Sequence, residues 1–293
     1  MSEPSAGSAH SLPENKVAIE DLRRRYNRLR IWLFIFLALM PLGCAGPLTL
    51  LALIPGLPKT AFVITSFALP VVGLAGTLLM GGDRSIVKRA LAGAQQAERM
   101  GLHFSQYTGG VAEAKRWQSL QMFGGADEHD SGGNLLWGEI DGERISFEDY
   151  VFVLGMGQNR SSHSRTLITL PEAARGLPDF LLTPNDWREK LSKLLGDRTI
   201  DFSNEPAFAR QFTVRGPAPD AVRACFSPEV IELCMADKHL IAEVQNGVLA
   251  IRPHGKLSHP KSYPELANHA VRLAKALRNA AQRQALEGSA PTR

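Results

Sequence analysis

Apolar residues are concentrated near the N-terminus, in two long runs without a charged residue. The first run covers residues 31–54 and the second covers residues 61–80. About 20 apolar helical residues cross the hydrocarbon core of a bilayer, so each run is long enough. The connection between them, Pro55–Thr60, is short and rich in turn-forming residues. The pattern predicts a hairpin of two transmembrane helices.

Basic residues flank this hairpin on both sides. Residues 16–30 and residues 83–100 each carry several lysines and arginines, whereas the connection between the apolar runs carries only Lys59. Both flanking segments also have the periodicity of helices. Because basic residues accumulate on the cytoplasmic side, we expect both termini in the cytoplasm and the short connection outside.

Composition divides the rest of the chain. Residues 1–15 are polar and poor in large apolar side chains, which predicts a disordered N-terminus. Residues 16–100 form the membrane hairpin with its flanking basic helices. Residues 101–285 form a cytoplasmic domain, and the polar tail 286–293 is expected to be disordered.

Alternating hydrophobicity within residues 101–285 predicts antiparallel strands. The clearest hairpins turn on Asp141-Gly142 and on Asn246-Gly247, two strong hairpin signals. The expected strands are 135–140, 144–154, 166–170, 200–202, 208–215, 240–245 and 248–252. The expected helices are 111–120, 185–195, a short one from Asp220, another from Ser227-Pro228, and 264–284. The fold class is therefore α+β: an N-terminal two-helix transmembrane hairpin, then a soluble domain of antiparallel β-hairpins with interspersed helices.

The segment Gly155–Ser164, read as a loop between two strands, is the candidate binding site. Polar and basic side chains that suit an anion or a peptide gather there. Loops often carry binding residues, which makes this segment a candidate. The candidates are Asn159, Arg160, Ser162, His163 and Arg165.

No pattern of catalytic residues stands out. The chain lacks a phosphate-binding Walker loop, a Gly-x-Ser-x-Gly elbow and a His-Glu-x-x-His zinc motif. The acidic loop around His129 and the pair His254 and His259 could hold a metal ion. Both lie among flexible residues that give no rigid ligand geometry, so loops without a metal are the favoured interpretation. We therefore predict no catalytic residues, no cofactor and no metal site.

Charge and cysteine content narrow the function further. The formal net charge is +4 without a long basic run, which argues against a nucleic-acid partner. Three cysteines form no disulfide framework, and Cys225 and Cys234 are expected to be buried thiols in the core.

Several short stretches carry a family resemblance. They are Gly138–Ile140, Phe147–Tyr150, Gly155–Thr166, Leu177–Phe180 with Pro184, and Phe208–Gly216. Over about residues 20–280 the chain resembles a group of uncharacterised bacterial membrane proteins with two N-terminal spans and a cytoplasmic α+β domain. The resemblance implies a bacterial inner-membrane location and no activity, substrate or cofactor.

The leading hypothesis is a non-enzymatic interaction or scaffolding module, anchored in the lipid bilayer by a multi-pass hairpin. Its partner would be another protein or a second copy of the chain, bound through exposed hairpin edges. The alternative is a membrane-tethered enzyme whose site is assembled around Arg160, His163 and Asp149. A channel would need several copies, because two spans cannot enclose a pathway.

Overall fold

The computed structural model describes residues 12–53, 59–106, 119–123, 126, 128–155, 157–185, 199–253, 255 and 257–288. The chain divides into two compact units. One spans Pro13–Gln95 and the other contains Gln96 and everything after it.

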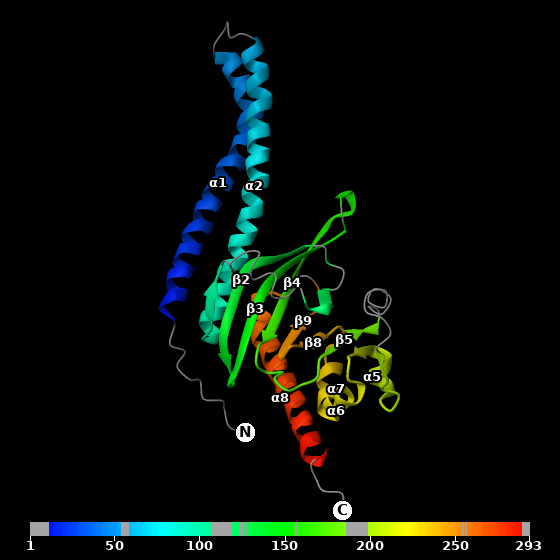
Figure 1. Ribbon diagram of the computed structural model, residues 1–293. Helices are drawn as coiled ribbons and strands as arrows, with labels where there is room; N and C mark the ends of the chain where they lie inside the picture. The colour runs from blue at the N-terminus through cyan, green and yellow to red at the C-terminus, as the bar shows by residue number, and fades with distance from the viewer. Residues whose placement is uncertain are drawn as a thin grey trace, which may run out of the picture. The chain divides into compact units, whose positions relative to one another are not determined.

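Two long helices make up the first unit, α1 (Pro13–Leu53) and α2 (Lys59–Met100). They run antiparallel, because Tyr26 accepts a hydrogen bond of 2.9 Å from Arg84 while Phe36 fills the space beside Gly76. Each predicted flanking helix continues into the neighbouring apolar run without a break (Figure 1). Helix α1 begins at Pro13, three residues before the predicted start. Among the residues described, no helix combines the length and apolar character needed to cross a membrane.

An antiparallel sheet dominates the second unit, with the order β1-β2-β3-β4-β9-β8-β5-β7-β6 among the described residues (Figure 1). The strands are β1 (His103–Ser105), β2 (Glu128–Ile140), β3 (Glu143–Leu154), β4 (Ser161–Leu170), β5 (Phe180–Pro184), β6 (Thr199–Ile200), β7 (Phe212–Arg215), β8 (Ile241–Gln245) and β9 (Val248–Arg252). The predicted α+β class is confirmed.

Both predicted tight hairpins are present. The β2–β3 turn holds Asp141 at φ 51° and Gly142 at φ 80°, and the β8–β9 turn holds Asn246 at φ 51° and Gly247 at φ 78°. These left-handed conformations are the ones that Asp-Gly and Asn-Gly adopt most readily, so the turn residues set the register of both hairpins.

Several elements differ from the predictions. Strand β4 begins at Ser161, not Thr166, because Ser161–Arg165 pair with Tyr150–Leu154 of β3. Strand β2 begins at Glu128, inside the stretch predicted as a flexible loop. Strands β1 and β5 were not predicted. The predicted strand 208–215 is helix α5 (Pro206–Gln211) followed by β7, because Pro206 starts a helix and the alanines continue it. The predicted helices 111–120 and 185–195 lie largely outside the described residues.

Helices cover one face of the sheet. They are α6 (Pro219–Cys225), α7 (Pro228–Met235) and α8 (Tyr263–Gly288), which includes the first residues of the expected tail. Tyr263 of α8 stacks on Phe147 of β3 with ring centroids 4.7 Å apart. Ser227 caps α7 as predicted, accepting a hydrogen bond from the amide of Val230. Cys225 and Cys234 are buried free thiols.

The opposite face of the sheet carries a second apolar cluster under the short turn η2 (Gln121–Phe123). Phe123 packs on Tyr150 and Phe152 of β3, with centroids 4.6 and 5.2 Å apart. Leu167, Leu181, Ile241 and Ala250 complete this cluster. The sheet is therefore buried on both faces, which explains why β3 is apolar on both sides.

An ion pair fixes α8 to the β2–β3 turn, since Arg278 donates to both carboxylate oxygens of Glu143. We expect Arg278→Gln to lower the free energy of unfolding by about 2 kcal/mol at pH 7. This hydrogen bonding holds the pKa of Glu143 below its ordinary value of 4.5. The contribution is therefore present above pH 4.5 and is lost as the pH falls through the lower folded-state pKa.

Urea unfolding at several pH values measures this effect. The control is Arg144→Gln, which breaks the exposed pair of Arg144 with Glu172 and is expected to cost less than about 0.5 kcal/mol. Equal losses in the two variants would contradict the assigned role of Arg278.

Candidate functional site

The predicted binding segment is mostly strand in the structure. The connection after β3 is short, with Gly155 at φ 81° and the turn η3 (Gly157–Asn159), and β4 follows at Ser161. A Cβ atom on Gly155 would overlap the carbonyl oxygen of Asn159, so this closure requires glycine. Polar side chains that suggested a wet loop instead form the first half of a paired strand.

The five candidate residues separate into two groups. Asn159, Arg160 and Ser162 are exposed, whereas His163 and Arg165 are half-buried on the face of the sheet under η2. His163 stacks on Phe152 at 5.5 Å and its Nε2 hydrogen-bonds Ser161 Oγ at 2.8 Å. Of the five, Arg165 lines the pocket of about 130 Å³ that is described below. The sequence analysis therefore identified one residue of that pocket, Arg165, and predicted it at the end of a loop.

The alternative enzyme site does not assemble as predicted. Asp149 is buried and accepts a hydrogen bond of 2.8 Å from Asn134 Nδ2. Alternation along β3 places it on the face of Phe147 and α8, whereas His163 lies on the face of Phe152. The sheet therefore separates Asp149 from His163, and the structure does not bring these two residues of the hypothetical enzyme site together.

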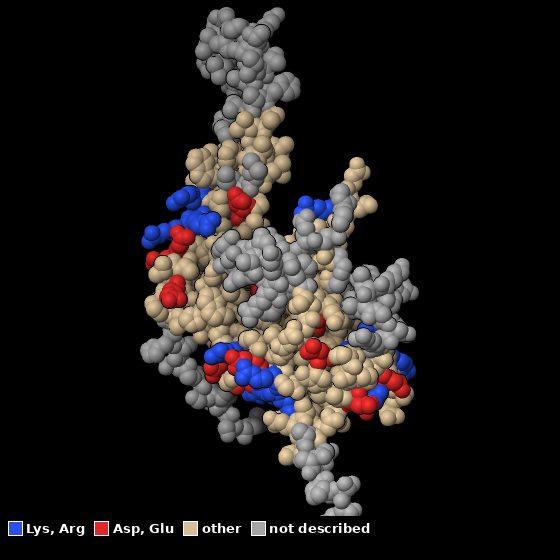
Figure 2. Space-filling model, in the orientation of Figure 1, with Lys and Arg blue, Asp and Glu red and all other residues tan. Residues whose placement is uncertain are grey.

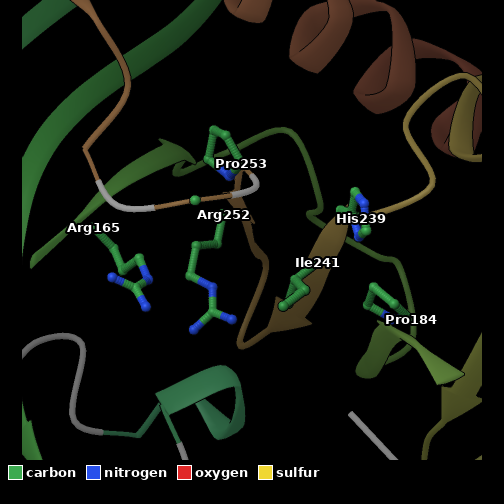
Figure 3. A pocket seen from close by; sticks show the side chains of 7 residues that line it. Arg165, Pro184, His239, Ile241, Arg252 and Pro253 are labelled. Carbon is green, nitrogen blue, oxygen red and sulfur yellow. The ribbon is translucent and has the colours of Figure 1, made fainter. Parts of the chain in front are cut away.

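A pocket of about 130 Å³ lies where β4, β8 and β9 meet. The residues that line it are Arg165, Pro184, His239, Ile241, Arg252, Pro253 and Gly255. Figure 3 shows the guanidinium groups of Arg165 and Arg252 side by side and pointing the same way, with His239 and Pro184 beyond Ile241. The described lining is thus basic at one end and apolar towards the other.

Both arginines are held in place by the strands around them. Arg252 is only 3% exposed and donates to the carbonyl of Met122 at 3.4 Å. Arg165 donates to the carbonyl of Ser164 at 2.9 Å, and its guanidinium lies 6.0 Å from the ring centroid of Phe152. These contacts fix the direction in which each fork of donors points.

Burial and mutual repulsion both disfavour the protonated forms of Arg165 and Arg252. Desolvation lowers the pKa of Arg252, the charge of Arg165 contributes in the same direction, and together they bring it to about 9. Desolvation also lowers the pKa of Arg165. Because about 9 is still above neutral pH, Arg252 remains protonated, and two cations share one small space.

Glu243 of β8 fastens η2 over this face. Its two oxygens accept hydrogen bonds of 2.8 Å from the amides of Gln121 and Met122. Glu243 is 1% exposed, and burial raises its pKa to about 7 against the opposing effect of these two bonds. The carboxyl group and Arg252 therefore hold the same turn, one through its amides and the other through a carbonyl.

Sequence reasoning missed Arg252, His239 and Glu243. The available signal was a charged residue in a buried strand, since both predicted strands 240–245 and 248–252 consist mainly of apolar residues. Charged residues are almost never fully buried unless they are paired, so these positions could have been singled out from the pattern.

No group of three or more potential metal ligands comes together in the part of the chain that the structure describes. His259 instead caps the short turn η5 (Pro260–Ser262), accepting from the amide of Lys261 at 3.2 Å. His254 and the side chain of His129 lie outside the described residues.

Comparisons with known proteins provide no family assignment. Neither the protein-family models, nor the curated proteins, nor the solved structures contain a significant match to this chain.

Proposed function

We propose that the protein is a membrane-anchored interaction module with no catalytic role. Residues 31–54 and 61–80 form two membrane spans, and residues 101–285 work at the cytoplasmic face of a bacterial inner membrane. Both termini are then cytoplasmic.

The observation that supports the anchor is the exposure of large apolar side chains along both helices. Those described within residues 31–54 and 61–80 are Ile31, Trp32, Phe34, Ile35, Leu37, Val71, Val72, Leu74 and Leu78, each at least 43% exposed. Figure 2 shows charged residues over the lower part of this helical unit and an uncharged surface above them. A soluble chain seldom leaves such a contiguous patch open, and lipid would cover it.

The binding role is supported by the pocket more than by the sheet edges. Among the described residues the edge strands β1 and β6 contain three and two residues, which leaves little edge for a partner strand to pair with. The pocket, in contrast, presents fixed donors in a confined space. Recognition is therefore assigned to the face of the sheet that carries Arg165 and Arg252.

Fractionation and fusion reporters on the full chain test the anchor. We expect the protein to stay with membranes after an alkaline carbonate wash and to be released only by detergent. A reporter that works only in the cytoplasm should be active when fused after Arg293, and a periplasm-only reporter should be active when inserted between Pro55 and Thr60. Release by carbonate would contradict the anchor, and the reverse reporter pattern would contradict the orientation.

A further inference from the structure

We infer that the pocket between β4, β8 and β9 binds a small oxyanion of the phosphate type, held by the guanidinium groups of Arg165 and Arg252. This inference deepens the proposed interaction role by naming the chemistry of the ligand. It does not depend on the membrane anchor, so each proposal can fail while the other holds.

The first argument is electrostatic. Arg252 is almost fully buried, Arg165 is partly desolvated, and the two cations repel one another. An anion placed between the two groups would remove this repulsion and would interact strongly, since the site is shielded from water.

The second argument is geometric. Each guanidinium is a planar fork of five donors, and the fork matches the oxygens of phosphate in paired hydrogen bonds. The backbone carbonyls of Ser164 and Met122 each accept from one nitrogen of the respective arginine and fix its orientation. Figure 3 shows the two forks side by side and directed the same way, so donors from two neighbouring strands face one region. Two adjacent forks suit an oxyanion with several oxygens.

The third argument is size. The pocket volume of about 130 Å³ is roughly four times the ~30 Å³ that a water molecule occupies in the liquid. Pockets for drug-sized ligands or cofactors measure about 300–1,000 Å³. The enclosed part therefore admits a phosphate group and leaves the remainder of a larger ligand outside.

The phosphate group could belong to a soluble metabolite or to a lipid headgroup, and both present the same oxygens. Isothermal titration of the full chain in detergent micelles with inorganic phosphate, at constant ionic strength set with chloride, measures binding to the site. We expect phosphate to bind the unmodified protein saturably and to bind Arg165→Gln at least about tenfold more weakly.

The matched control is Arg175→Gln, which removes the same charge from an exposed position that does not line this pocket and should bind phosphate normally. Arg165→Lys keeps the charge and loses the fork, so it should bind several-fold more weakly. If circular dichroism shows that Arg165→Gln does not fold, the Arg165→Lys variant provides the test. Absence of saturable binding, or equal weakening in Arg175→Gln and Arg165→Gln, would overturn the inference.

A second arm assigns the source of the phosphate group. The full chain is placed in nanodiscs of phosphatidylcholine, with or without phosphatidic acid. If phosphatidic acid abolishes phosphate binding and Arg165→Gln is insensitive to the lipid, the site takes a headgroup. If disc composition has no effect, the site takes a soluble phosphate. Both results are compatible with the oxyanion site, because the first arm establishes its dependence on Arg165 and the second arm identifies only the source of the phosphate group.

Discussion

The stabilisation that Glu243 contributes is expected to decrease by about 3 kcal/mol as the pH rises from 4.5 to 7. Burial raises the pKa of Glu243 from 4.5 in the unfolded chain to about 7 in the fold, and each pKa unit corresponds to about 1.4 kcal/mol. Because the folded-state pKa is raised, the contribution is fully present below pH 4.5 and is lost as the pH rises through 7.

Comparison with Glu243→Gln isolates this effect. Glutamine is uncharged at every pH and leaves one of the two amides of η2 without its acceptor, so its cost does not change with pH. The difference in unfolding free energy between the protein and this variant should shrink with rising pH in urea titrations. The exposed Glu139→Gln should leave the profile unchanged. A difference that stays constant from pH 4.5 to 7 would mean that the pKa of Glu243 is not raised in the fold.

Phe147→Ala is expected to lower the free energy of unfolding by about 3–5 kcal/mol. Phe147 is fully buried and its ring stacks on Tyr263, so its truncation opens a cavity between the sheet and α8. Urea unfolding followed by circular dichroism measures the loss. Leu286→Ala on α8 is the control, because Leu286 is 72% exposed and its loss should stay within about 0.5 kcal/mol. A loss below 1 kcal/mol for Phe147→Ala would contradict the assigned packing.

Local signals predicted the hairpins well. Asp141-Gly142 and Asn246-Gly247 specify their turns through backbone conformations that few other residues adopt, and the flanking alternation sets the strand register. Ser227 and Pro228 likewise specify a helix start through capping chemistry. In each case the deciding interactions lie within a few residues along the chain.

Elements decided by distant contacts could not be predicted. Strand β5 is five residues long and ends in Pro184, and it is a strand because it lies between β8 and β7. The first half of β4 is polar and pairs only because β3 extends beside it. The same limit applies to the site, since Arg165 and Arg252 are 87 residues apart in the sequence and meet only through the pairing of β4 with β9.

The sheet order has a consequence for synthesis on the ribosome. Strands β1–β4 and the group β5, β7 and β6 are joined only through the β8–β9 hairpin, which comes last among the strands along the chain. Domains tend to fold from the N-terminus as they emerge, at about 5–20 residues per second. Until residue 252 has left the exit tunnel, β4 and β5 both present open edges to solvent and to other nascent chains. The interval before closure is therefore when this protein would benefit most from a chaperone.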